Sequence, residues 1–150
     1  MGNNWKITDT LTKVFADEVP DGQGSIRLST LHRETVSCVI AYFGAADWGR
    51  YWKVSVKAPE KIETRLRRVE LVPSAYPCHK EQDDNYLRIV PGMYPDLLRD
   101  LDTEDDGADK KYLTKEVPGQ WRSLWLDVTV DAELAGGDYA IVIETETEDG

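Results

Sequence analysis

The clearest alternation of apolar and polar residues in the chain lies between Gln120 and Glu146. Its first part alternates with period two, with Leu124, Leu126, Val128 and Val130 on one face and Trp125, Asp127 and Thr129 on the other. Such a period is typical of a β-strand with one buried face. Residues 139–144 alternate in the same way. The glycine-bearing acidic connection 131–138 is too short for the crossover helix of a parallel pair, so the pattern predicts two antiparallel strands joined by a turn.

Three further strands are indicated upstream of this pair. Residues 36–43 are apolar on both faces, which is typical of a central strand covered on two sides. Residues 51–58 alternate cleanly, with Trp52 on the inward face, and Pro59 ends the run because proline cannot donate to a ladder. Residues 64–72 read as a strand with a bulge or a change of face at 67–68.

Weaker patterns predict shorter elements. We expect short strands at 13–16, 26–28 and 86–90, and one helical turn at 96–101 with Asp96 as its cap. Prolines punctuate residues 73–115, and residues 100–109 are strongly acidic and should lie in solvent. Many strands separated by turn signals, without an amphipathic helix pattern, predict an antiparallel β-sandwich of immunoglobulin-like or jelly-roll-like type with long Pro-rich and acidic loops.

Length and charge narrow the class of protein. The 150 residues suit one domain, so we expect residues 1–150 to form a single sandwich. A net charge of −10 disfavours nucleic acid and anionic membrane as partners. No apolar run has the length of a membrane span. Residues 1–6 lack the features of a signal peptide, which favours a cytoplasmic protein, or a secreted one whose signal was removed.

Candidate chemistry is sparse. His32 and His79 have no matching partner set, and the adjacent pair Cys78-His79 has the wrong spacing for ligands of one zinc ion. Whether Cys38 and Cys78 pair cannot be judged from the sequence, and we expect free thiols.

Residues 102–113 share some positions with a calcium-binding loop. Asp102-x-Glu104-x-Asp106-Gly107 resembles the first half of such a loop, but its twelfth position is Leu113 rather than glutamate. A solvated loop is therefore favoured. We expect no metal ion, no cofactor and no catalytic residue in this chain.

The aromatic residues suggest binding roles. Trp48, Tyr51 and Trp52 form the densest aromatic cluster, and aromatic faces stack on sugars. Because large aromatics are usually core or interface residues, a carbohydrate site at Trp48, Tyr51 and Tyr94 is the alternative rather than the leading hypothesis. Trp125 lies opposite Leu124, so either a second layer covers it or it contacts another domain.

Two segments resemble a known family. Residues 86–98, with Pro91-Gly92-Met93-Tyr94-Pro95-Asp96-Leu97-Leu98, look like the "PG-x-YPD-x-L" stretch of the N-terminal domain of glycoside hydrolase family 123 and its uncharacterised relatives. Residues 117–128, with Gln120-Trp121-Arg122-Ser123-Leu124-Trp125, are similar to that domain's "Q-x-RSLW-x-x-V" strand. Weaker similarities at 137–139 and 33–37 extend the resemblance over most of the chain from about Leu31.

The resemblance implies an N-terminal β-sandwich that precedes a TIM-barrel catalytic domain. Family members hydrolyse β-linked N-acetylgalactosamine, with the substrate's acetamido group as nucleophile and an Asp-Glu pair on the barrel. No residue here matches that pair, and 150 residues cannot hold both domains. The acidic insertion 100–109 departs from the family pattern.

We therefore expect a non-catalytic accessory module that packs on the catalytic barrel of a glycoside hydrolase and orients it. The candidates for the domain interface are the segment Pro91–Leu98, in particular Tyr94, Pro95 and Asp96, and Trp125. There are two alternatives, because sandwiches host many unrelated functions. The chain is either a carbohydrate-binding module that binds glycans or a free-standing interaction domain.

Overall fold

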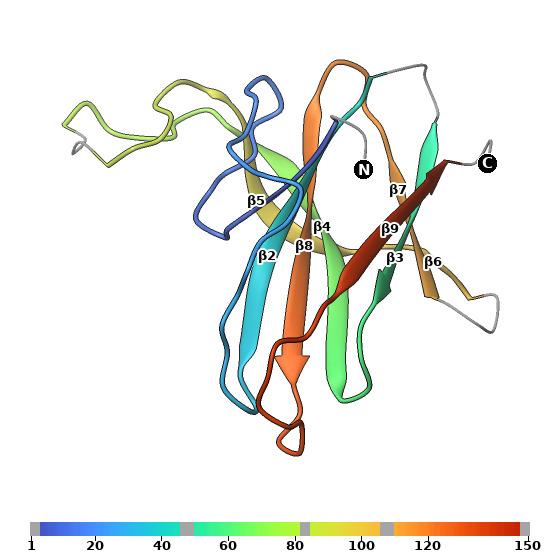
Figure 1. The fold of residues 1–150 in the computed structure, drawn as a ribbon. Helices are drawn as coiled ribbons and strands as arrows, with labels where there is room; N and C mark the ends of the chain where they lie inside the picture. The colour runs from blue at the N-terminus through green and yellow to red at the C-terminus, as the bar shows by residue number, and fades with distance from the viewer. Residues whose placement is uncertain (1–3, 46–49, 82–84, 106–109, 148–150) are drawn as a thin grey trace.

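The computed structural model describes residues 4–45, 50–81, 85–105 and 110–147, which form a β-sandwich of two antiparallel sheets (Figure 1). The large sheet has, in spatial order, β1 (Trp5–Thr8), β2 (Thr35–Phe43), β8 (Trp121–Val130), β4 (Ile62–Ser74) and β5 (Gly92–Asp100). The small sheet has β6 (Thr103–Asp105), β7 (Lys110–Lys115), β3 (Tyr51–Lys57) and β9 (Val142–Thr147). Within these ranges there is no helix, and hence none that could span a membrane. The predicted fold class is confirmed.

β8 lies at the centre of the large sheet and shows the alternation that the sequence predicts. Its even-numbered residues from Leu124 to Val130 are buried, whereas Trp125, Asp127 and Thr129 are half-buried. These even positions meet the inner face of β2, where Leu126 pairs with Cys38 and Leu124 with Ile40. The small sheet covers this core with residues such as Val54 and Tyr112.

β2 is buried on both faces, as its apolar run predicts. Its inner face belongs to the main core, and its outer residues Val39 and Ala41 form a second cluster with Trp121 and Val14. Val14 comes from the segment that follows β1, which lies across the outer face of the large sheet and is not a strand. The expected strand at 13–16 is therefore wrong, but the segment supplies the layer that covers β2.

The expected antiparallel pair formed by the last two strands is also wrong. β8 is paired along both edges, with β2 on one side and β4 on the other, and so has no free edge for β9. The chain after Val130 crosses to the small sheet, where β9 pairs with β3. Period-two alternation identifies a strand and its buried face, but it does not identify the neighbouring strand.

Tertiary pairing overrides the remaining local signals. Residues 26–28 and 86–90 are not strands, and residues 96–100 belong to β5 instead of a helical turn. Residues 96–100 are extended because the whole stretch 92–100 pairs with the free edge of β4. The irregularity in β4 falls between Glu70 and Leu71, opposite β5, rather than at 67–68.

Candidate functional site

The three residues of the predicted carbohydrate site are not brought together by the described structure. Trp48 lies outside the described residues. Tyr51 is on β3 of the small sheet, with the Lys115 ammonium 5.3 Å from its ring centre. Tyr94 is on β5 of the large sheet and is half-buried. A sugar site at these residues stays a prediction.

Trp52 lies inside the sandwich, as its place in the alternation predicts. Its ring packs edge-on against Trp5, with 5.3 Å between the ring centres. Its indole N–H donates to the Glu116 carboxylate at 2.5 Å. Trp52 is therefore partly buried and packs against the main core.

The described parts of the connection between β4 and β5, residues 75–81 and 85–91, extend away from the body of the sandwich (Figure 1) and are called the projecting lobe below. Exposed large apolar side chains concentrate on it and on the adjoining β5: Tyr76, Tyr86, Leu87, Ile89, Val90, Met93 and Leu97. Tyr76 is 93% exposed and Leu87 is 72% exposed. Exposed apolar surface of this kind is typical of an interaction site, since leaving it in water is unfavourable.

A compact anchor ties the projecting lobe to the sandwich. The Arg88 guanidinium lies 3.8 Å from the centre of the Phe15 ring and forms ion pairs with Asp17, at 2.8 Å, and with Glu18. The hydrogen bond from Arg88 is the main cause that holds the pKa of Asp17 below its usual value.

Tyr94 completes this anchor from β5. Its ring packs edge-on against Phe15, with 5.8 Å between the centres, and its hydroxyl donates to the Val90 carbonyl oxygen at 2.5 Å. A second contact reaches the Arg88 carbonyl oxygen at 3.3 Å. Tyr94 is therefore the residue that fixes the base of the lobe. The lobe presents its apolar side chains from a fixed base, which lowers the ordering cost of binding.

The other predicted interface residues differ in accessibility. Pro95 is buried, whereas Asp96 is exposed. Met93 and Leu97, which belong to the predicted contact segment Pro91–Leu98, are exposed apolar side chains and are better placed to contact a partner. Their signal in the sequence is the density of apolar residues between Tyr86 and Leu98.

Trp125 lies on the outer face of the large sheet, in a hydrogen-bonded network centred on Asp127. One Asp127 oxygen accepts from the Ser37 hydroxyl at 2.6 Å and from the Trp125 indole N–H at 2.7 Å. The other accepts from Arg67 at 2.5 Å. The Trp125 ring also packs against the cluster that contains Val14. The segment after β1 thus covers Trp125 in part, and its polar atom is satisfied within the chain.

The Asp127 network has a testable pH dependence. Burial alone would raise the pKa of Asp127, but the hydrogen bonds from Ser37, Trp125 and Arg67 outweigh it and hold the pKa below its usual value. A carboxylate whose pKa is lowered by folding stabilises the fold above its unfolded pKa, near 4, and loses that contribution as the pH falls through its folded pKa. Asp127→Asn should therefore be less stable than the wild type at pH 7, and the difference should shrink by pH 3.

Urea unfolding at both pH values measures this difference. Asp96→Asn, at an exposed carboxylate on β5, is the matched control and should unfold like the wild type at pH 7. If Asp127→Asn lowered the free energy of unfolding by the same amount at pH 7 and at pH 3, the charge of Asp127 would not stabilise the fold.

Groups with possible catalytic or metal-binding roles are dispersed. In the part of the chain that the structure describes, no group of three His, Cys, Asp or Glu side chains is placed to hold a metal ion. In the acidic segment Glu104 pairs with Lys53 at 2.8 Å, while Asp106 and Gly107 lie outside the described residues. Cys38 and Cys78 are free thiols. Burial raises the pKa of Cys38 to about 11, so it is protonated at neutral pH and a poor nucleophile.

A scan of the sequence against models of known protein families found no match, and a search of curated proteins found none either. The resemblance to the glycoside hydrolase domain therefore stays a prediction.

Proposed function

We propose that this chain is a non-catalytic accessory β-sandwich that packs on the catalytic domain of a glycoside hydrolase, with the projecting lobe and β5 as the docking surface. The observation that carries this proposal is the concentration of exposed apolar side chains on the lobe and β5. The set includes two tyrosines and one methionine, and aromatic residues and methionine are enriched in protein interfaces.

The anchor supports a docking role over a solvated loop. The stacked guanidinium and the two ion pairs of Arg88 hold the base of the lobe in one position, so the lobe would lose little conformational freedom on docking. Arg88 itself is largely covered, since only 13% of its side chain is exposed. β5, which directly follows the lobe, carries almost all of the Pro91–Leu98 motif on which the family resemblance rests, so the resemblance and the exposed apolar side chains indicate the same part of the molecule.

Acidic side chains at the base of the lobe could form the polar rim of the docking surface, around its exposed apolar residues. Asp17 and Glu18 at the base of the lobe are exposed, with 70% and 63% of their side chains in solvent. Interfaces commonly have a polar rim around the residues that are buried on binding. We therefore expect the partner to present an apolar groove for the lobe and basic groups opposite these two carboxylates.

Hydrogen exchange tests the docking surface. The isolated chain should be compared with the polypeptide that its complete gene encodes, and residues 86–97 should exchange about tenfold or more slowly in the longer polypeptide, because docking excludes water from them. The longer polypeptide should hydrolyse an aryl β-N-acetylgalactosaminide, and the isolated chain should not. Equal exchange in both, or a gene that ends with this sandwich, would refute the proposal.

Charge substitution on the lobe gives a second prediction. Leu87→Asp with Met93→Asp in the longer polypeptide should restore fast exchange at the lobe, since two carboxylates would be buried without partners at a cost of several kcal/mol. The control is Leu11→Asp, at a side chain that is 85% exposed on a different segment. If all three substitutions leave the exchange unchanged, the docking surface is elsewhere.

A further inference from the structure

A partly open cavity of about 930 Å³ lies against the inner face of the large sheet, and residues 24–30, 134–139 and 141–143 cover it. We infer that this cavity binds an uncharged, mainly apolar small molecule. Its size falls in the range of about 300–1,000 Å³ that is typical of small-molecule sites. It does not involve the projecting lobe, so the inference is independent of the docking proposal.

The floor of the cavity is apolar and rigid. Cys38, Leu126 and Val128 from β2 and β8 line it, and all three are buried. Both strands are paired through this region, so their backbone positions are set by the ladder. A floor of this kind is preformed for a ligand with apolar surface.

The cavity exists because the cover cannot fill it. The cover includes several small residues, among them Gly24, Ser25, Ser29, Gly136 and Gly137, which leave space between its larger side chains. A Cβ added at Gly24 or at Gly136 would meet no atom within 4 Å. β9 begins only at Val142, so the small sheet does not extend over this part of the floor.

Apolar side chains on the cover remain in contact with water. Ile26, Leu28 and Tyr139 line the cavity and are 37%, 38% and 43% exposed. A bound apolar molecule would cover these side chains from the cavity side, and removal of apolar area from water favours binding.

The charges at the cavity indicate an uncharged ligand. The Arg27 guanidinium and the Asp138 carboxylate, both among the lining residues, neutralise each other at 2.8 Å. His32 Nε2 donates to the Leu134 carbonyl oxygen at 2.7 Å and is therefore already engaged. An anionic ligand would have to break the Arg27 ion pair and would approach a chain of net charge −10.

The experiment uses 1-nonanol, with nonanoate as its anionic counterpart. Titration calorimetry on the isolated chain should show saturable binding of 1-nonanol and affinity for nonanoate at least about tenfold lower. The inference would be overturned if 1-nonanol showed no saturable binding, or if nonanoate bound as tightly as 1-nonanol.

Cavity filling locates the site. Gly24→Phe with Gly136→Phe should weaken 1-nonanol binding at least about tenfold, because the added rings occupy the free volume. Gly92→Phe is the matched control, since a Cβ at Gly92 also meets no atom within 4 Å and Gly92 does not line the cavity. Equal binding by the filled variant and the control would overturn the inference.

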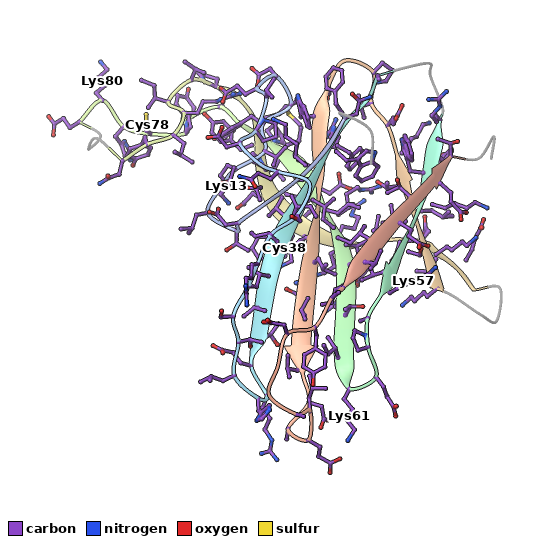
Figure 2. All side chains as sticks on the ribbon, in the orientation of Figure 1. Lys13, Cys38, Lys57, Lys61, Cys78 and Lys80 are labelled. Carbon is purple, nitrogen blue, oxygen red and sulfur yellow. The ribbon has the colours of Figure 1, made fainter. Side chains whose placement is uncertain are left out.

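The two cysteines report on the site within one molecule. Figure 2 shows Cys38 on β2 in the body of the sandwich and Cys78 on the projecting lobe. At pH 8.5 Cys38 reacts slowly with N-ethylmaleimide, because its raised pKa keeps most of the thiol protonated. 1-Nonanol at ten times its dissociation constant leaves only about one tenth of the sites open, so it should slow this alkylation about tenfold further. Cys78 should react at an unchanged rate. Slowing of both thiols, or of neither, would place the ligand elsewhere.

Discussion

Leu124→Ala is expected to lower the free energy of unfolding by about 2–5 kcal/mol, because it empties a site that cannot fully collapse. Leu124 has no exposed surface. It pairs with Ile40 on β2 and with Arg68 on β4, so the backbone is held on both sides and cannot move inward. Urea unfolding measured by tryptophan fluorescence and by circular dichroism gives the value, and the two transitions should coincide.

Thr129→Ala is the matched control on the opposite face of the same strand. Its side chain makes one exposed hydrogen bond, to the Thr35 hydroxyl at 2.8 Å. Loss of such a bond costs about 1 kcal/mol or less, because water replaces the partner. If both substitutions destabilised the protein equally, the burial pattern of β8 would be incorrect.

The sequence was sufficient to predict the strands that are buried along their length. β2 and β8 carry unbroken apolar positions at period two, and burial of those positions against a second layer is the dominant favourable term in folding. The pairing of β9 with β3 could not be predicted, because alternation is the same whichever edge a strand joins. The acidic connection after Val130 reads as a hairpin turn but spans the two sheets.

Local signals in β5 were misleading for a specific reason. Pro95 and Asp96 suggest a break and a helix cap, but β5 is an edge strand, where proline is tolerated. Pro95 pairs with Leu71 and Leu97 pairs with Glu70, so Asp96 has no opposite residue and forms an irregularity. The chain continues as a strand on either side of it.

The anchor of the projecting lobe was not predictable from sequence. Arg88 contacts Phe15 and Asp17, which are far away in the chain, and neither residue belongs to a motif. Only the apolar density of residues 86–98 and the family resemblance indicated this region. Long-range contacts of this kind depend on the packing of the segment after β1, which carries no periodic pattern of its own.

Gly44→Ala is expected to destabilise the fold by about 2–4 kcal/mol, through overpacking and lost hydrogen bonds. A Cβ at Gly44 would lie 2.2 Å from the Val117 carbonyl oxygen and 2.7 Å from its carbon, and these are backbone atoms that cannot rotate away. Gly44 N–H donates to the Gln120 carbonyl oxygen at 3.0 Å, and the Gly44 carbonyl accepts from Gly119 at 2.8 Å. Relief of the clash must therefore separate two backbone segments that these bonds hold together.

The matched control is Gly92→Ala, where a Cβ meets no atom within 4 Å and a loss of about 0.5 kcal/mol or less is expected, as for an ordinary surface substitution. Urea unfolding of the two variants gives the comparison. The segment that Gly44 contacts, Val117-Pro118-Gly119, also requires a glycine. Gly119 adopts a φ of +70°, which a residue with a Cβ rarely does. Gly44 and Gly119 thus allow the close approach of the end of β2 to residues 117–120, which precede β8. If Gly44→Ala unfolded at the same urea concentration as Gly92→Ala, the close approach of these two segments would be wrong.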